Sequence, residues 1–509
     1  MNLNRLKGNI FGGITAGVIA LPLALAFGIA SGLGAVSGLY GAIILCFFAS
    51  LIGGTPTQIS GPTGPMTVVI ASMVANHPNN LNLVFFTIFL AGIFQIILGF
   101  CKVGKFVQYL PYPVISGFMS GIGVIILLLQ VNQFLGLDYS GHPALSLINV
   151  AKNFGHINPL CPILGIAVLL IIIFTPKKLR NYFPPTLLAL LIITVLSIVL
   201  GLDVPTIGTI PQSLPSIKLG MINFQEFRIV LPIAMTLAVL GSIDSLLTSV
   251  VADSLTKTKH KSNKELIGQG LGNLVTSLFG GLAGAGATMR TVVNIKSGGT
   301  TKLSGIIHSI FLILVVIFFG SFVSKIPLAV LAAILFKVGF DIIDYKFLKI
   351  IKHAPKSDIF VMIAVFLITV FDDLIFAVGI GVVLSSVLFV ARSAQDTKLK
   401  MNATDDYFEE TDNDKAIILH VNGNLFFGSS SFLLSQLQTL KQYETVIIDL
   451  RNAINIDISA VFAIEDMIIR MKEQGIETLI VFEDRKTASK LLRLGLRHII
   501  SKENIKFSL

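Results

Sequence analysis

Charged residues are scarce in this chain: Asp, Glu, Lys and Arg together make up 13% of its 509 residues. Soluble globular proteins carry about 25% charged residues. Hydrophobic residues reach 53% and the mean hydropathy is +0.83. Apolar runs of about 20 residues, the length that crosses a hydrocarbon core, recur from Ile10 to Val390. This composition excludes an ordinary soluble protein and predicts an integral membrane protein.

Cysteine and tryptophan are also rare, with three Cys and no Trp. Cys46, Cys101 and Cys161 lie in or beside apolar runs without a CxxC or His-rich pattern, which argues against a zinc site or a disulfide framework. The formal net charge of +10 comes from short clusters of Lys and Arg between apolar runs. We therefore expect no nucleic-acid partner. The sequence holds no catalytic constellation, so we expect neither an enzyme nor a bound cofactor.

The apolar runs between Gly, Pro and charged breaks predict the membrane spans. Twelve full spans are expected near residues 9–29, 33–53, 82–101, 111–135, 160–175, 184–201, 228–250, 266–283, 303–322, 325–337, 358–374 and 375–391. The first apolar stretch is too long for a signal-peptide core, so we expect this helix to stay in the protein. Two shorter, broken segments, 57–75 and 286–298, bring the total to about fourteen.

Basic residues alternate between the loops, as the positive-inside rule requires. With the N-terminus in the cytoplasm, the cytoplasmic loops hold Lys102 and Lys105, then Lys177, Lys178 and Arg180, then Lys257 to Lys264, then Lys296 and Lys302, then Lys337 to Lys356. The alternation holds only if both broken segments cross the membrane. We therefore expect a multi-pass protein of the plasma (inner) membrane with both termini cytoplasmic.

The two broken segments occupy corresponding positions in the two halves of the chain. Without gaps, Thr67-Val68-Val69 aligns with Thr291-Val292-Val293, each after a Gly-rich stretch that contains Thr. Paired short spans interrupted by Gly or Pro indicate the binding site of a transporter. The alternative is a pair of kinked helices that pack through small residues.

A helix that begins inside the membrane points unpaired N–H groups and its positive dipole end at the bilayer midplane. Two such N-termini that face each other form an anion site from backbone alone. Extended backbone at this depth is tolerated where it is buried or lines a cavity. The broken segments therefore predict a site for a small anion.

Asp244 and Arg290 are the ionisable residues expected at membrane depth beside this site. Asp244 lies in an otherwise uncharged span with Thr248 one turn further on the same face, which suits Na⁺ or a proton relay. Arg290 begins the second half-helix. It either holds the anion and pairs with Asp244 or anchors the segment at the cytoplasmic face beside Lys296.

The chain turns polar after Arg392, and we divide it into a transmembrane domain (1–392), a linker (393–414) and a terminal domain (415–509). Strand-like and helix-like pieces alternate in the terminal domain, which predicts a small α/β sheet fold. They are expected at Ala416–Val421, Phe432–Leu440, Thr445–Leu450, Ser459–Gln474 and Thr478–Val481. Ser459 is the expected N-cap of the second helix and, if phosphorylated, a regulatory site.

These motifs resemble the SulP anion-transporter family over nearly the whole chain. The similarity rests on Ala20-Leu21-Pro22, Gly61-Pro62-Thr63-Gly64-Pro65, Asp244 with Thr248, and Gly284-Ala285-Gly286-Ala287-Thr288. The terminal domain resembles a STAS domain. The runs from Ser249 to Thr256 and from His260 to Gly270 are especially similar to BicA-type bicarbonate transporters of photosynthetic bacteria.

The resemblance implies fourteen spans in two inverted seven-helix repeats, a core and a gate domain, a homodimer and an elevator-like movement of the core. It implies that the anion contacts Thr63 and the backbone at Ala287, and that Na⁺ lies near Asp244, Thr248, Gly286 and Thr288. The candidate anion-binding set is Thr63, Gly64, Ala287, Thr288 and Arg290. Asp244, Thr248, Gly286 and Thr288 form the candidate cation set.

The leading hypothesis is a secondary transporter of bicarbonate, coupled to Na⁺. Arg290 stands where sodium-coupled members are expected to carry a small residue, and its charge could replace that of Na⁺. Proton coupling through Asp244, or uncoupled exchange, is therefore an alternative, with sulfate, another oxyanion or a dicarboxylate as the substrate. Membrane lipid and a cytoplasmic partner of the STAS-like domain are further expected partners. An anion channel and a non-transporting scaffold are the other classes.

Overall fold

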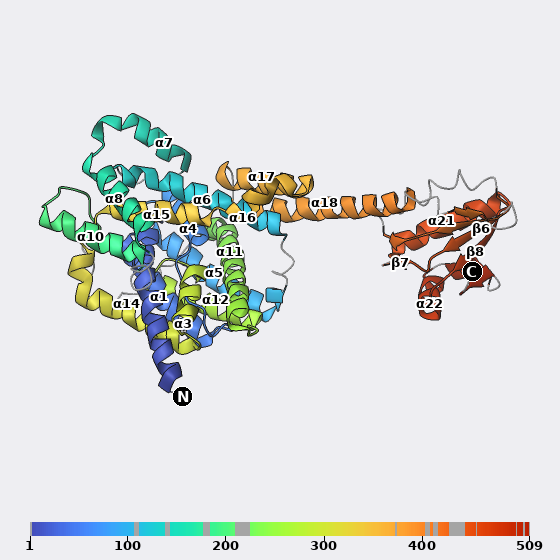
Figure 1. Cartoon of the computed structure of the whole chain (residues 1–509), viewed down its shortest axis with the longest axis horizontal. Coiled ribbons are helices and arrows are strands. Elements are labelled where there is room, and N and C mark those ends of the chain that lie inside the picture. Colours follow the sequence, from blue (N-terminus) through green and yellow to red (C-terminus); the bar gives the residue numbers. More distant parts are fainter. Residues whose placement is uncertain are drawn as a thin grey trace. The chain divides into compact units, whose positions relative to one another are not determined.

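A computed structural model describes residues 3–105, 111–137, 143–176, 184–208, 224–371, 374–402, 408–410, 416–426, 443–454, 456–494, 496–501 and 504–507. The chain forms two compact units, residues 1–382 and 383–509. The first unit is a bundle of helices and the second contains a β-sheet (Figure 1). Each unit is considered by itself.

The first half of the bundle begins with α1 (Leu3–Ala30) and ends with α10 (Pro185–Val199). Between them come α2 (Ala35–Tyr40), the π-helical η1 (Gly41–Leu45), α3 (Cys46–Ile52), β1 (Ser60–Gly61), α4 (Gly64–Asn76), α5 (Leu81–Phe100), α6 (Tyr112–Phe134), α7 (Pro143–Lys152) and α8 (Leu160–Phe174). Pro111 and Pro184 cap α6 and α10. The fixed φ of proline suits a helix start, where an N–H would lack a partner.

The second half of the bundle begins with α11 (Phe224–Thr256), which carries Asp244. It continues with α12 (Ser262–Leu278), β2 (Ala285–Gly286), α13 (Thr288–Lys296), α14 (Lys302–Val323), α15 (Leu328–Ile342), α16 (Tyr345–Ile350), α17 (Lys356–Phe371) and α18 (Leu374–Asn402). Every predicted span, including both broken segments, thus coincides with a helix of the described residues. Helices α7 and α16 were not predicted.

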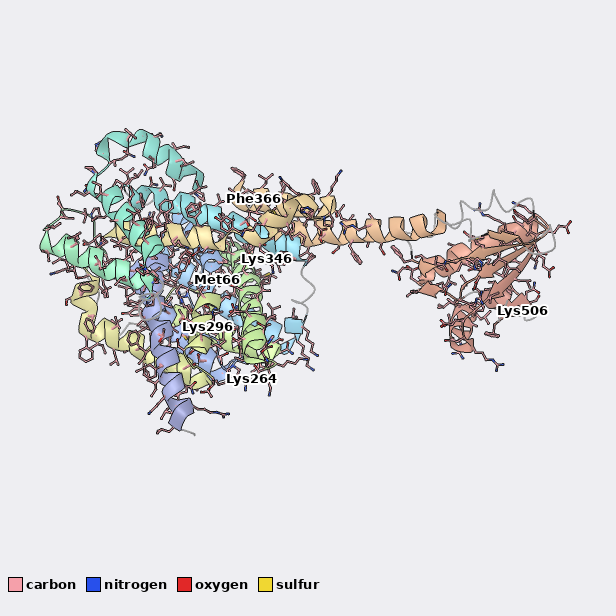
Figure 2. The ribbon with its side chains drawn as sticks, viewed as in Figure 1. Met66, Lys264, Lys296, Lys346, Phe366 and Lys506 are labelled. Carbon is pink, nitrogen blue, oxygen red and sulfur yellow. The ribbon has the colours of Figure 1, made fainter. Side chains whose placement is uncertain are left out.

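Seven helices in the described part of the chain are long and apolar enough to cross a membrane, and three shorter apolar helices accompany them. Many of their large hydrophobic side chains are exposed, Phe174, Phe318 and Phe389 among them. Such surfaces suit contact with lipid. By contrast, Met66 of α4 is fully buried inside the bundle (Figure 2). The number of crossings, about fourteen, stays a prediction.

The bundle divides into two groups of helices that match the expected core and gate domains. In the core group, α12 packs along α5 and α3, and α1 packs on α14 as α11 packs on α5. If the second seven spans repeat the first seven, α11 corresponds to α1 and α14 to α5. The α1–α14 and α11–α5 contacts are then equivalent, as such a repeat requires. In the gate group, α6 packs against α15 and α17, and α8 against α10 and α15. Both half-helices, α4 and α13, contact core helices α1 and α11.

The second unit holds a five-stranded sheet of order β3-β4-β6-β8-β9. Its strands are β3 (Phe408–Glu410), β4 (Ala416–His420), β6 (Thr445–Asp449), β8 (Glu477–Val481) and β9 (Ile505–Lys506), with β3 antiparallel and the others parallel. β5 (Gly423–Asn424) pairs with β7 (Ala453–Ile454). Helices α21 (Ile458–Glu473) and α22 (Arg485–Arg493) complete the unit around a buried apolar core. The predicted helix Phe432–Leu440 lies outside the described residues.

One expectation for this part of the chain was wrong. Ser459 is not the N-cap of α21: Asp457 caps it, accepting a hydrogen bond from the Ala460 N–H at 2.8 Å, and Ser459 lies in the first turn. Asp competes with Ser for the cap position, and here the helix begins one residue earlier. Helix α18 continues to Asn402, into the segment predicted as the linker, and the bounds of the linker stay a prediction. The regulatory role of Ser459 stays a prediction.

Candidate anion and cation site

The two broken segments meet as a pair of short antiparallel strands inside the core group. Ser60 of β1 lies opposite Gly286 of β2, and Gly61 opposite Ala285. Each strand runs directly into its half-helix, β1 into α4 and β2 into α13. The N-cap residues Thr63 and Ala287 both have extended backbone. The structure thus brings together two segments that lie more than 200 residues apart in the sequence.

The half-helices begin in the same way, at the positions that the sequence alignment indicated. The first helical bond of α4 joins the Thr67 N–H to the Thr63 carbonyl at 3.0 Å. In α13 the equivalent bond joins the Thr291 N–H to the Ala287 carbonyl at 2.9 Å. Backbone N–H groups before these bonds have no partner within their own helix. They and the helix dipoles favour an anion at both N-termini.

Gly64, the first residue of α4, is covered by gate helices. A Cβ at this position would come within 2.9 Å of Ile126 Cδ1 on α6 and 3.2 Å of Ile342 Cδ1 at the end of α15. The Cβ of a larger residue would displace the ends of these two isoleucine side chains. Glycine therefore allows the N-terminus of α4 to approach the gate helices closely.

A cluster of oxygen atoms joins β2 and α13 to α11. The Thr248 hydroxyl donates to the Gly286 carbonyl at 2.9 Å and lies 2.7 Å from the Thr288 hydroxyl. The Gly286 N–H donates to the Ser245 hydroxyl at 3.0 Å. Three members of the candidate cation set are thus in direct contact. Neutral oxygen atoms of this kind are the ligands that hard cations prefer.

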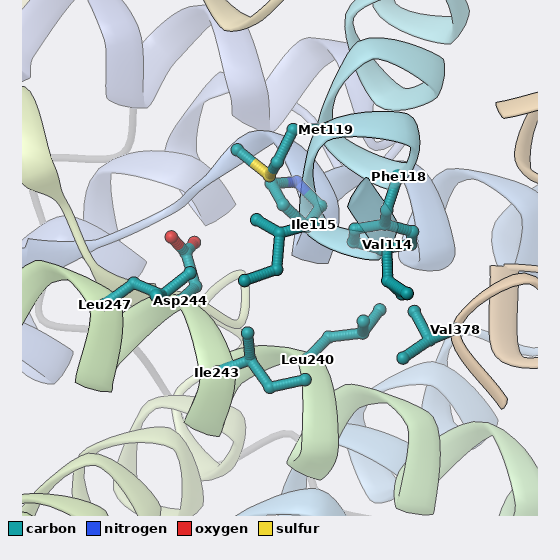
Figure 3. Close-up of a pocket in the computed structure, with 10 residues that line it drawn as sticks. Val114, Ile115, Phe118, Met119, Leu240, Ile243, Asp244, Leu247 and Val378 are labelled. Carbon is teal, nitrogen blue, oxygen red and sulfur yellow. The ribbon is translucent and has the colours of Figure 1, made fainter. Parts of the chain in front are cut away.

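Asp244, the fourth member of the set, lies one helical turn before Thr248. Its half-buried carboxylate is the only charged group among the ten residues that line a cavity of about 30 Å³ between α11 and α6 (Figure 3). The buried Thr63 hydroxyl has no hydrogen-bond partner of normal geometry among the described residues, and it faces Asp244. A carboxylate one helical turn from this cluster of neutral oxygens fits Na⁺ or a proton, and the Thr63 hydroxyl can donate to Asp244 or to an anion.

Arg290 does not pair with Asp244, so this part of the prediction was wrong. Its side chain is buried, and Nη2 donates to the Pro62 carbonyl at 3.2 Å. Nη1 has no partner among the described residues. The guanidinium lies against Gly61 of β1, where an added Cβ would clash with Nη1. Arg290 follows Thr288 by two residues, about 200° around the helix, so the two side chains leave α13 on opposite sides. Its role in anion binding stays a prediction.

Several polar residues around this site were missed at the sequence level. Gln58, Ser249, Glu265, Gln269 and Asn273 are all buried in the core group and hydrogen-bonded around the two strands. Three of them recur at intervals of four residues, Glu265, Gln269 and Asn273, which places them on one face of α12. That spacing was a readable signal. The contacts between α12 and the distant strands could not be read from the sequence.

Comparison with known proteins agrees with the arrangement of the bundle. The family model described as the sulfate permease family matches residues 6–365, and the STAS domain model matches residues 407–508. The chain belongs to the sulfate permease (SulP) family. It is therefore a multi-pass membrane protein and an anion transporter with a C-terminal STAS domain. Its family and close relatives are transporters rather than enzymes.

Named relatives of this SulP chain span nearly its full length. The bicarbonate transporter BicA of Synechocystis sp. is 42% identical over 99% of this chain and 93% of its own. The putative sulfate transporter YvdB of Bacillus subtilis is 33% identical over 99% and 96%. The transmembrane domain of a cyanobacterial BicA superposes with a TM-score of 0.69 at 50% identity, covering 74% of this chain and 99% of that one.

A more distant relative shares the fold of the whole chain. The structure of SLC26A9 superposes with a TM-score of 0.85 at 18% identity, over 99% of this chain and 89% of its own. At that identity the likeness shows the fold alone. Fold and family thus agree with the packing of the half-helices inside a helical core.

Proposed function

We propose that this protein is a secondary transporter of small inorganic anions whose preferred substrate is bicarbonate. The observation that carries the proposal is the antiparallel pairing of β1 with β2, each of which runs directly into a half-helix, at Thr63 and at Ala287. The anion lies between these N-termini and contacts Thr63, Gly64, Ala287 and Thr288. The relatives named as bicarbonate transporters support this substrate, at 42% and 41% identity.

The coupling ion is proposed to be Na⁺, held by the Asp244 carboxylate with oxygens of Thr248, Gly286 and Thr288. A cation at this position balances the charge of the anion beside it, so each ion favours binding of the other. Arg290 adds a fixed positive charge near the N-terminus of α13. A proton on Asp244 is the alternative partner, since the same carboxylate can be neutralised by either ion.

Transport is proposed to follow an elevator mechanism, in which the core group carries the ions past the gate group. Both half-helices belong to the core, so the site moves with it. The protein is proposed to work as a homodimer in the plasma (inner) membrane with both termini in the cytoplasm. There the STAS domain is available to a cytoplasmic partner.

A flux panel with purified protein in liposomes tests the proposal. Uptake of labelled bicarbonate, sulfate and a dicarboxylate is measured with and without Na⁺ and with and without a pH gradient. We expect saturable, Na⁺-dependent bicarbonate uptake. Sulfate uptake without bicarbonate uptake would contradict the substrate, and it would favour the alternative suggested by the relative named as a putative sulfate transporter, at 33% identity.

The same panel separates the other classes of function. Uptake driven by a pH gradient and indifferent to Na⁺ would transfer the coupling role to a proton. Current that does not saturate with anion concentration would indicate a channel. Complete absence of flux for every anion, with the protein folded, would leave a membrane scaffold for the STAS domain.

A further inference from the structure

Helix α12 presents one continuous polar face to the two crossing strands. Glu265, Gln269 and Asn273 follow one another at intervals of four residues and are each 0–1% exposed. Such a row runs along one side of a helix. Buried polar groups of this kind are costly unless they are hydrogen-bonded. Glu265 and Asn273 are bonded to backbone of the non-helical segments at the site, and Gln269 is bonded to the side chain of Ser60 in β1.

Glu265 holds the segment that leads into β1. Its Oε2 accepts hydrogen bonds from the backbone N–H groups of Gly54, at 2.8 Å, and Thr55, at 2.7 Å. Its Oε1 accepts from the side-chain amides of Gln58, at 3.0 Å, and Gln269, at 2.9 Å. All four donors are uncharged amides. Both carboxylate oxygens are thus engaged in fixing the chain before the first half-helix.

Gln269 and Asn273 extend this contact to both strands. The Gln269 amide donates to the Ser60 hydroxyl in β1 at 2.6 Å. Asn273 contacts Gly284, just before β2, from both ends of its amide: Nδ2 donates to the carbonyl and Oδ1 accepts from the N–H, both at 3.0 Å. The same Nδ2 donates to Gln95 of α5 at 2.8 Å. One helix face therefore holds the segments before both half-helices.

We propose that Glu265, Gln269 and Asn273 are positioning residues that hold the two half-helix N-termini at a fixed separation and so set the affinity for the anion. The two strands bond to each other through two residue pairs and through the Ala287 N–H, which donates to the Ile59 carbonyl at 2.8 Å. Thr291 and Asn294 of α13 also bond to the first segment, at Ile59 and Thr57, and α12 adds a third element that is bonded to both segments. Because both strands are bonded to α12, the two halves of the site form one rigid unit. The inference rests on the proposed anion site, since the affinity is that of the transported anion.

The contacts also separate the roles of the two buried carboxylates. A protonated Glu265 would give up an acceptor position and lose a bond to the chain, whereas Asp244 lies on the wall of a cavity beside the Thr63 hydroxyl. Glu265 therefore positions the site, and Asp244 is the carboxylate that meets the coupling ion.

Hydrogen exchange of the full-length protein in nanodiscs tests the positioning role without transport. Glu265→Gln replaces one acceptor oxygen by a donor, so we expect about tenfold faster exchange in residues 53–60. Asn273→Ala removes the contacts to Gly284, so we expect a similar increase in residues 282–287. Each variant should affect its own segment most. Asn132→Ala is the control. It removes another fully buried Asn, whose side chain has no hydrogen-bond partner among the described residues. It should leave the exchange rate of both segments unchanged.

Anion uptake by the same variants then tests the link to affinity. We expect Glu265→Gln and Asn273→Ala each to raise the KM for the transported anion about tenfold, with a smaller effect on kcat. Asn273→Asp keeps the acceptor for the Gly284 N–H. Its KM should therefore lie between those of wild type and Asn273→Ala. Uniformly faster exchange throughout the core group would mean a purely structural role and would overturn the proposal. So would local loosening with an unchanged KM. If wild type transported no anion, the exchange data would still test the contacts, and the function would fail separately.

Discussion

Asp244 and Thr63 come from the two halves of the chain and face each other across the candidate site. The carboxylate belongs to α11 and the hydroxyl to the N-cap of α4. A hydroxyl in this position can donate to the carboxylate or to a bound anion, but not to both with one proton. A cation on Asp244 would release the Thr63 hydroxyl to the anion. In the proposed mechanism, this exchange couples the binding of the two ions.

Replacing Asp244 by Asn is therefore expected to remove cation dependence. The amide keeps the shape but loses the charge, and we expect anion uptake to fall about 10- to 100-fold, the range for losing one charged hydrogen bond. Uptake in liposomes with and without Na⁺ or a pH gradient measures this. Asp253→Asn is the matched control on the same helix, since Asp253 binds His260 at 2.7 Å. Normal cation-dependent uptake by Asp244→Asn would remove the residue from the mechanism.

Asp449 of β6 makes the stability of the STAS domain sensitive to acid. Burial raises its pKa, but hydrogen bonds from Arg451 and His420 outweigh burial and hold the pKa below its usual range. A lowered pKa contributes stability above the unfolded value of about 3.9, and this contribution is lost as the pH falls through the folded pKa. Calorimetry of the full chain should show that the transition temperature of the domain falls as the pH is lowered below about 4. The drop should be smaller in Asp449→Asn, and an equal drop in both proteins would contradict this account.

At the scale of single elements, the cap of α21 allows a simple comparison of two neighbouring residues. Asp457→Ala removes the acceptor for the Ala460 N–H and should cost about 1 kcal/mol of domain stability. Ser459→Ala, in the first turn, should change stability by about 0.5 kcal/mol or less. Calorimetric transition temperatures of the two variants measure the difference. A larger loss in Ser459→Ala would restore Ser459 as the residue that secures the helix.

The helices of the bundle were predictable because hydropathy and Gly or Pro breaks mark them directly. Even α4 and α13 were visible, since Thr67 and Thr291 begin matching Thr-Val-Val motifs. Helix α7 was missed because it is not a continuous apolar run. The short strand β3 was missed because its sequence, Phe408-Glu409-Glu410, is polar and becomes a strand by pairing with β4. Local pattern reveals elements with their own hydrophobic signal and misses those that depend on a partner.

The direction of the Arg290 side chain could not be predicted for a related reason. The sequence places it near the N-terminus of α13, but its direction depends on the exact first residue of the helix. A shift of one residue rotates a side chain by about 100°. The bonds from α12 to Gly54 and Gly284 depend likewise on the folded path of two loops. Candidate residues were therefore accessible from the sequence, whereas their partners were not.

At the scale of the whole molecule, the two compact units should unfold as separate bodies. Phe482 is fully buried in the core of the STAS domain, so Phe482→Ala should destabilise that domain by about 3–5 kcal/mol. We expect calorimetry to show a lower transition temperature for the domain and an unchanged transition temperature for the bundle. Leu190→Ala, a buried residue of α10, should have the opposite pattern. A common shift of both transitions would mean that the units unfold together.

The central claim is that backbone N–H groups of the half-helices hold the transported anion, and Met289 offers its most direct test. The offset that relates Thr67 to Thr291 also relates Pro65 to Met289, so Met289→Pro removes one N–H at a position where the first half-helix already has proline. Met289 is 63% exposed, and Met289→Ala is the control that keeps the N–H. Concentration-dependent uptake of labelled bicarbonate should show a KM about tenfold higher in Met289→Pro than in Met289→Ala. Equal KM values in the two folded variants would contradict the claim.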